Sequence, residues 1–404
     1  MMNAVASRNI KFVSHSDQGG RGDGTQVMVH RGYAYVGHAF SNGFSVIDVR
    51  DPKHPKTVNF LAAPPNTRAF HLQTHDNLLL TVNAPNVWTM KIDTKSYFSS
   101  APADLIKGET FTAGLRVFDI SQPETPREIA FMPIDGLGPH RIWYVGGRYA
   151  YVSVHFADVA DHVLAIVDMA NPQKPEVVGR FWLPGLGPGE MPTWPKGKRV
   201  ALHHGLVSGH LFYGAWRDGG LGIVDVSDPR KPKLVCHRNW DPPFGGATHS
   251  PLPLPDRNLL VVGDETNFAN CSQGLRYTWM FDIREPSNPV SIATFPIPTD
   301  ADYCKKGGNF GLHNLWENRP EGLQSSRYIF SAYQNAGLRV YDIENQFSPR
   351  EIGYYVPPDP DRLFDPRPNK PKVVQSADCF VDKQGLIYLT DNNAGLSILQ
   401  FNGT

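Results

Sequence analysis

The chain has 404 residues, with 39 basic and 39 acidic side chains, so its formal net charge is zero. A balanced charge lacks the basic patch of a nucleic-acid-binding protein and gives no reason to expect binding to an anionic membrane surface. The length favours either two ordinary domains or one repetitive architecture.

The amino-terminal segment MMNAVASRNIKF lacks the apolar run of a signal peptide, and no later segment is apolar for long enough to cross a bilayer. We therefore expect a cytoplasmic protein that acts on a small-molecule substrate and has no nucleic-acid or membrane partner. The four cysteines, Cys236, Cys271, Cys304 and Cys379, are far apart and form no CxxC pair. This spacing predicts four free thiols.

One phrase recurs along the chain. It is complete in GFSVIDVRDPKHP from Gly43, GLRVFDISQPETP from Gly114, VLAIVDMANPQKP from Val163, GLGIVDVSDPRKP from Gly220 and GLRVYDIENQFSP from Gly337. A looser copy begins at Met280, and a last copy begins at Gly395, close to the chain end. The seven copies are usually roughly 50 to 60 residues apart, as in a repeat protein built from small sheets.

Each repeat predicts a small four-stranded sheet. The phrase itself is an alternating strand of β-branched and apolar residues closed by a proline turn. A strand such as YAYVG at Tyr33 precedes it, another apolar stretch lies further upstream, and a strand such as KPKLVCH follows. We therefore predict an all-β fold, a seven-bladed β-propeller with four-stranded blades, as one domain over residues 1–404.

The last repeat lacks its outer strand, whereas the strand-like stretch NIKFVSH from Asn9 has no partner near it in the sequence. We expect this amino-terminal strand to complete the last blade. Closure of this kind leaves no exposed sheet edge.

The phrase GLGIVDVSDPRKP from Gly220 resembles the LVIVD-repeat family of β-propellers, and weaker copies extend over nearly the whole chain. The resemblance implies a propeller and no particular reaction. Each phrase contains an aspartate before its turn, where such a side chain caps backbone N–H groups. We expect a structural role for these residues, Asp48, Asp119, Asp168, Asp225, Asp282 and Asp342.

Four neighbouring repeats place a histidine at the start of the innermost strand. Alignment of the repeats on their second strands gives His140 in GPHRIWY, His204 in ALHHGLV, His249 in ATHSPL and His313 in FGLHNLW. In the fourth repeat the neighbouring His203 is the alternative. The same position holds Asp378 in the seventh repeat, Gln26 or Thr25 in the first, and Phe70 or His71 in the second.

Because the inner strands of a propeller converge on its axis, these histidines should form a ring at one face, which we call the top. Neutral imidazole is a good ligand for divalent transition metals. We predict a metal held by His140, His204, His249 and His313, with iron as the first choice and manganese, zinc or copper as alternatives. His203, His71, Asp378 and His38 are alternative ligands or outer partners, and hydrogen-bonded channel histidines are the structural alternative.

The ends of the second strands should lie on the same face. There Glu265 and His155 are candidates for general acid or base, and Arg217 for holding an anionic substrate. For each of them alone, an ordinary loop residue is the alternative. The long connection 84–113, with Trp88, Tyr97, Phe98 and Phe111, is a candidate lid over the ring. No motif suggests a nucleotide cofactor.

These residues predict a metal-dependent enzyme. The four-histidine arrangement resembles that of the carotenoid-cleaving oxygenases, which implies an iron-type oxidoreductase, such as a dioxygenase, acting on a small organic substrate. The alternatives are a non-redox metal-dependent lyase, isomerase or hydrolase, and a non-catalytic scaffold for protein partners with an open channel mouth.

Overall fold

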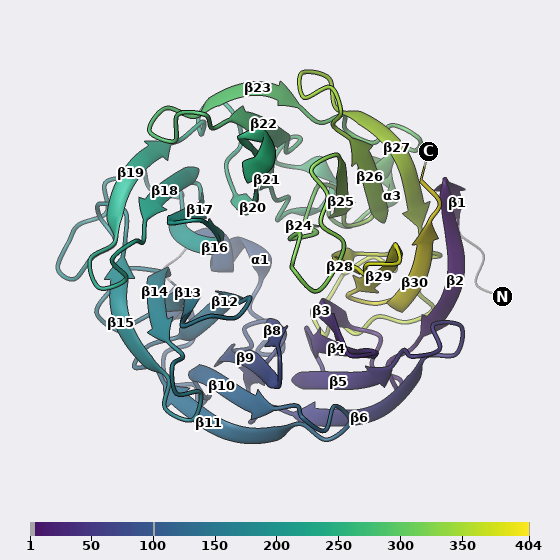
Figure 1. Ribbon diagram of the computed structural model, residues 1–404, viewed down its shortest axis with the longest axis horizontal. Coiled ribbons are helices and arrows are strands. Elements are labelled where there is room, and N and C mark those ends of the chain that lie inside the picture. Colours follow the sequence, from purple (N-terminus) through teal and green to yellow (C-terminus); the bar gives the residue numbers. More distant parts are fainter. Residues whose placement is uncertain (1–4, 100–101, 404) are drawn as a thin grey trace.

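The repeats form a closed ring of seven small sheets. The computed structural model describes residues 5–99 and 102–403. Within this part, antiparallel sheets of four main strands surround a central axis, with the chain running from the inner to the outer strand of each sheet (Figure 1). The predicted all-β, seven-bladed propeller is confirmed.

The first three blades follow the repeats in order. They consist of β3 (Gly24–His30), β4 (Tyr33–His38), β5 (Gly43–Asp48) and β6 (Lys56–Ala62); of β7 (Thr67–Arg68), β8 (Leu72–His75), β9 (Leu78–Pro85), β10 (Gly114–Asp119) and β11 (Arg127–Pro133); and of β12 (Gly138–Trp143), β13 (Tyr149–His155), β14 (Val163–Asp168) and β15 (Glu176–Phe181).

The remaining blades have the same order. They consist of β16 (Val200–Ser208), β17 (Leu211–Arg217), β18 (Leu221–Asp225) and β19 (Lys233–Arg238); of β20 (Thr248–Leu254), β21 (Leu259–Asp264), β22 (Thr278–Asp282) and β23 (Val290–Thr294); of β24 (Asn314–Leu315), β25 (Tyr328–Ala332), β26 (Leu338–Asp342) and β27 (Arg350–Val356); and of β28 (Ser376–Val381), β29 (Leu386–Asp391), β30 (Gly395–Phe401) and β2 (Ile10–Ser16).

The amino-terminal strand closes the ring, as predicted. Strand β2 pairs antiparallel with β30 and becomes the outer strand of the seventh blade. The preceding strand β1 (Ala6–Arg8), which the sequence pattern did not reveal, pairs with β27 of the sixth blade. Strands β1 and β2 follow one another along the rim near the carboxyl terminus (Figure 1), so the amino-terminal segment joins two blades.

Helices in the described residues are short. They are α1 (Thr94–Ser99), α2 (Pro102–Leu105), α3 (Tyr303–Lys306) and the 3₁₀ turns η1 (Pro255–Arg257) and η2 (Ala269–Cys271). None of the helices in this part of the chain has the length and apolar character needed to span a membrane.

The repeat aspartates have the structural role that the sequence predicts. Each is the last residue of a third strand, and one carboxylate oxygen accepts the backbone N–H two residues further on. The N···O distances are 2.8–3.0 Å at Asp48, Asp119, Asp168, Asp225, Asp282 and Asp342. These contacts fix the turn into each outer strand.

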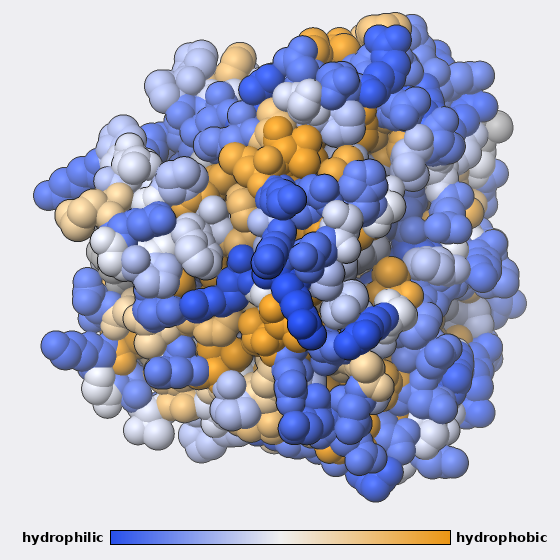
Figure 2. Space-filling model, turned by 60° about the vertical axis from the view of Figure 1, so that its left-hand side comes forward, coloured by the Kyte–Doolittle hydropathy of each residue, from blue (hydrophilic) through white to orange (hydrophobic). Residues whose placement is uncertain are grey.

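The core lies between adjacent blades, and the three inner strands of a blade are buried along nearly their whole length. Val46, Leu79 and Leu338, for example, belong to three different blades and are fully buried in one apolar cluster. The outer strands are only partly buried, and the side of the molecule shown in Figure 2 is mainly hydrophilic, with a hydrophobic patch near its middle. Because successive residues of a strand point to opposite faces, this continuous burial shows that each blade packs against its neighbours on both faces.

The prediction of four free thiols is wrong for two of the cysteines. Cys271 and Cys304 form a disulfide, with Cα atoms 5.4 Å apart, whereas Cys236 and Cys379 are free and buried. The loops after β21 and β23 bring the two cysteines together although 33 positions separate them in the sequence. The cytoplasmic location stays a prediction that the structure does not test.

Reduction of this disulfide should lower the free energy of unfolding by about 3 to 4 kcal/mol, because the bond closes a loop of intermediate length. Urea unfolding with and without dithiothreitol measures the loss. A Cys271→Ser/Cys304→Ser double variant is the control, since dithiothreitol should have no further effect on it. Equal destabilisation of the double variant by the reductant would contradict the assignment.

A candidate metal centre in a cationic pocket

The inner strands of the third, fourth and fifth blades are irregular at the position where their histidines occur. The pairing register shifts between Pro139 and Ile142, between Val200 and His204, and between Thr248 and Ser250. Similar shifts occur in the first and seventh blades. Such bulges redirect a side chain out of the regular alternation. Here they accompany side chains at the upper end of the central channel.

Five histidines from five successive blades line one pocket there: His71, His140, His203, His249 and His313. Neighbouring rings are close, with centroid distances of 4.9 Å from His71 to His140, 4.6 Å from His140 to His203, 3.7 Å from His203 to His249 and 4.8 Å from His249 to His313. The histidine ring of the sequence analysis therefore exists, with different members.

His204 is not part of this ring. Its Nε2 atom lies 2.8 Å from Oε1 of Glu317, and it does not line the pocket. Adjacent residues of a strand point to opposite faces, so only one of His203 and His204 can face the ring. The position belongs to His203, the alternative of the sequence analysis, and the four-histidine set with His204 is wrong.

Two ring histidines are already engaged in a hydrogen-bond chain. A guanidinium N–H of Arg68 donates to Nδ1 of His140 at 3.1 Å, so the proton of His140 is on Nε2. That N–H donates to Nε2 of His203 at 2.8 Å, and Nδ1–H of His203 donates to the carbonyl of His249 at 3.0 Å. Because each nitrogen is satisfied within this chain, the arrangement resembling the carotenoid-cleaving oxygenases is not supported.

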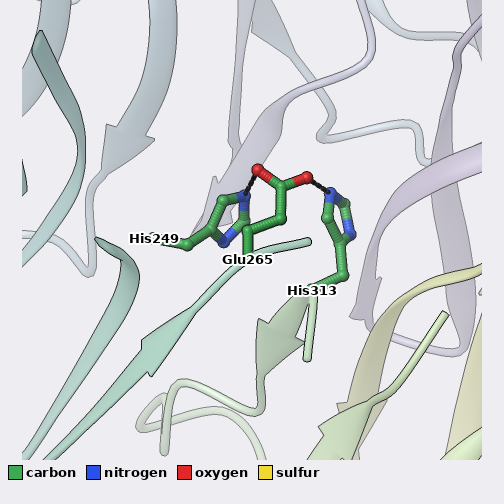
Figure 3. Close-up of side chains that lie close together, drawn as sticks. All are labelled: His249, Glu265 and His313. Atoms are coloured by element: carbon green, nitrogen blue, oxygen red, sulfur yellow. Dashed lines mark ion pairs between the residues drawn. The ribbon is translucent and has the colours of Figure 1, made fainter. Parts of the chain in front are cut away.

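His249, His313 and Glu265 have a different geometry. Their ligand atoms lie within 4.8 Å of one another. The Glu265 carboxylate lies between the two rings, with one oxygen directed at each (Figure 3). Nε2 of His249 is 3.5 Å from Oε2, and Nε2 of His313 is 3.6 Å from Oε1. These distances are too long for hydrogen bonds and leave room for a cation.

The other nitrogens fix the tautomers of these two rings. Nδ1–H of His313 donates to the carbonyl of Ala377. The Ser250 hydroxyl donates to the carbonyl of His313 at 3.2 Å, so Nδ1–H of His249 donates to the Ser250 oxygen at 2.8 Å. Nε2 of His313 is therefore an acceptor that faces carboxylate oxygen, also an acceptor, and a cation between them would satisfy both. A metal-binding histidine commonly has this arrangement, with its second nitrogen bonded to a carbonyl or another acceptor.

Burial keeps the ring histidines neutral. It lowers the pKa of His71, His140, His203 and His249 well below the usual value, and nearby positive charges such as Arg68, Arg141 and Arg217 act in the same direction. Burial also lowers the pKa of His313, although the Glu265 charge opposes this shift. Neutral imidazoles can bind a metal at neutral pH without losing a proton first.

Glu265 belongs to a second tier of residues at the rim. Arg217, Glu265 and Gln334 follow the second strands of three successive blades, and each pairs with the next inner strand through backbone bridges to Thr248, Leu312 and Ser376. Arg217 has a φ of 50°, a strained left-handed conformation for a side chain of this size. Its Nη1 atom lies 3.5 Å from Oε2 of Glu265.

The pocket above the ring has a volume of about 160 Å³ and is partly open to solvent. Trp88, Tyr97 and Phe98, from the connection 84–113, line it together with the ring and the rim. This segment contains α1 and α2, and Figure 1 shows α1 over the channel. The position over the pocket is the one expected for a lid, whereas Phe111 does not line the pocket.

Three other candidate residues lie outside the pocket lining. His155 is buried at the end of β13 with its Nδ1 unpaired. His38 is bonded to Asp23 at 2.9 Å and Ser45 at 2.8 Å, which marks a structural role. Asp378 is buried and accepts the backbone N–H of Val27 at 3.2 Å.

One residue of the pocket, Arg68, was not found from the sequence. It has no equivalent in the other repeats and stands at the break between β7 and β8.

Three segments of the chain match a family model, the LVIVD repeat. They are residues 21–60, 141–182 and 206–238. These segments cover most of the first, third and fourth blades. The resemblance of the phrase to this repeat is therefore confirmed. Among curated proteins, the search found no sequence relative.

Solved structures with similar folds are propellers of low sequence identity. Saccharomyces cerevisiae Sqt1 has a TM-score of 0.59 and 8% identity, with 99% of this chain and 100% of that chain covered. U3-55K has a TM-score of 0.58 and 8% identity over 97% and 98% of the two chains. A candidate 6-phosphogluconolactonase from Bacteroides fragilis has a TM-score of 0.55 and 11% identity over 82% and 84%. At such identities the similarity concerns the fold alone.

Proposed function

We propose that the protein is a metal-dependent enzyme whose metal binds to His249, Glu265 and His313 at the top of the channel. The observation that carries this proposal is the pair of neutral imidazoles whose Nε2 atoms face the two oxygens of one carboxylate at 3.5 and 3.6 Å. Burial of these groups without a cation would leave acceptors facing each other.

Two imidazoles and one carboxylate suit several metals. The set is typical of non-haem iron oxygenases, and zinc peptidases use the same residue types. Iron is therefore our first choice, with manganese, zinc or copper as alternatives. A bound ion with open coordination positions would supply a Lewis acid or a centre for oxygen chemistry. Our first proposal for the reaction is oxidation of a small organic substrate.

The protein residues around this set would orient the substrate and exclude water. Trp88 and Phe98 line the pocket from the connection 84–113, and the hydrogen-bonded pair His140 and His203 forms a rigid wall beside His249. This enclosure favours the enzyme over the scaffold alternative, which predicted an open channel mouth.

A non-redox lyase, isomerase or hydrolase is the second candidate, and Tyr97 is the observation that favours it. The guanidinium of Arg199 lies over its ring, with Cζ 4.6 Å from the ring centroid. Although burial opposes ionisation, the charges of Arg199, Arg68 and Arg217 outweigh it and lower the pKa of Tyr97 to about 8. A phenol with this pKa can move a proton near neutral pH. Tyr97 replaces His155 in this role, because His155 does not line the pocket.

Metal analysis of protein purified without a His-tag tests the proposal. We expect one transition metal ion per chain, measured by mass spectrometry, and tight binding of added Fe²⁺ or Zn²⁺ by protein stripped with a chelator. Oxygen consumption with candidate substrates would identify the redox reaction, and anaerobic turnover with Zn²⁺ or Mn²⁺ the non-redox one. Failure of the stripped protein to bind any of these ions would refute the metal centre.

A further inference from the structure

The pocket contains more positive than negative charge. Its described lining residues include four cations, Arg68, Arg217, Arg367 and Lys370, and a single carboxylate, Glu265. Arg367 has its own counter-ion, because it forms two bonds to Asp365 at 2.9 and 2.6 Å. The other three cations of the lining therefore share the single carboxylate of Glu265.

Arg68 is the least compensated of these cations. It is 4% exposed, its Nε has no hydrogen-bond partner, and it forms no ion pair with any carboxylate in the described part of the chain. It donates to the neutral imidazole of His140 at 3.1 Å, and its guanidinium lies over the Phe70 ring, 4.8 Å from the ring centroid. By contrast, the buried Arg199 forms two bonds to Asp161 at 2.7 and 3.1 Å. A buried cation without an anion is costly, so the pocket favours a negatively charged ligand.

Arg217 has a counter-ion that the metal would compete for. Its contact with Glu265, at 3.5 Å, is long for a charged hydrogen bond. If Glu265 binds a metal, as the proposed function requires, its charge is shared with the ion and Arg217 also lacks a full partner. The two cations are close enough to affect each other's charge. Burial is the main cause that lowers the pKa of Arg68, and the charge of Arg217 lowers it further.

We infer that the substrate carries a carboxylate or phosphate group and that Arg68 and Arg217 bind this group in the pocket beside Glu265. This inference rests on the proposed function, because it takes the pocket to be the substrate site of an enzyme. The side chains of the anion site are nevertheless present without the metal. Guanidinium groups recognise both anions through paired N–H donors. Arg68 thereby also positions the hydrogen-bond chain through His140 to His203.

Calorimetric titration of metal-free protein tests the inference, with inorganic phosphate, malonate and neutral malonamide as probes in a buffer free of other oxyanions. We expect saturable binding of phosphate or malonate and none of malonamide. The preferred anion identifies the substrate group. Arg68→Met should weaken binding by at least about 10-fold, the usual effect of losing charged hydrogen bonds. The matched control Arg367→Met should change it less than about 2-fold, because Asp365 already pairs with this side chain.

Glu265→Gln separates this inference from the metal proposal. The variant should lose metal binding, yet it should bind the anion more tightly, because Arg217 no longer has a competing carboxylate. Absence of anion binding in both the wild type and Glu265→Gln would overturn the inference and leave the metal result intact. Equal affinities of wild type and Arg68→Met, with folding confirmed by circular dichroism, would overturn it as well.

Discussion

Alanine at His249, Glu265 or His313 will lower the metal affinity at least about 100-fold, beyond the 10- to 100-fold loss typical for outer partners of metal ligands. Each substitution removes one of three donors whose atoms lie within 4.8 Å of one another. Competition with a chelator of known affinity, followed by metal analysis of the protein fraction, measures the change.

His204→Gln is the matched control. His204 lies next to the ring residue His203 on β16 and is buried to a similar degree. It pairs with Glu317 outside the pocket. We expect the variant to keep the metal affinity of the wild type within about 3-fold, the spread of contributions at a site without direct contact. Loss of metal from His204→Gln together with retention in His313→Ala would contradict the assigned ligand set.

Unfolding must be separated from ligand loss, because buried substitutions lower stability. Glu265→Gln keeps the size of the side chain and removes its charge, so it should fold and still lose the metal. Added Zn²⁺ should raise the melting temperature of the wild type, since a ligand that binds only the folded state stabilises it. The same addition should leave the melting temperature of Glu265→Gln unchanged.

The fold was readable from the sequence because the physical cause of each blade is local. Short runs of β-branched and apolar residues between turns mark the strands, and the aspartate before each turn accepts a nearby backbone N–H. Closure by β2 could be predicted because the amino-terminal strand has no partner near it in the sequence and the last repeat lacks its outer strand. The disulfide could not be predicted in the same way, since it depends on how two long loops lie on the top face.

The site was only partly readable for a different reason. Repeat alignment located the inner strands correctly, but the bulge before His204 changes which of two adjacent histidines faces the channel. Hydrogen bonds then decide which histidine nitrogens can bind a metal. Both nitrogens of His140, for example, are bonded to Arg68 and His203. The donor set combines two histidines of the ring with one carboxylate of the rim, and such a combination across blades has no sequence spacing of its own.

The protonation state of the buried Asp378 gives a prediction that can be tested without the metal. It is 5% exposed, and burial raises its pKa to about 8, helped by the charge of Glu317 and opposed by that of Arg141. In the unfolded chain the same carboxyl has a pKa of about 3.9. Between these two values the folded state therefore holds a proton that the unfolded state has lost, and a rise in pH favours unfolding.

The stability of the metal-free wild type relative to Asp378→Asn should therefore fall by about 1.4 kcal/mol for each pH unit between about pH 5 and pH 7. It should become constant above about pH 8, where folded Asp378 also ionises. Urea unfolding of both proteins at several pH values gives this difference and cancels the titration of all other groups. A difference that stays constant over the range would mean that Arg141 holds Asp378 ionised, and the channel would then contain a buried ion pair instead of a neutral carboxylic acid.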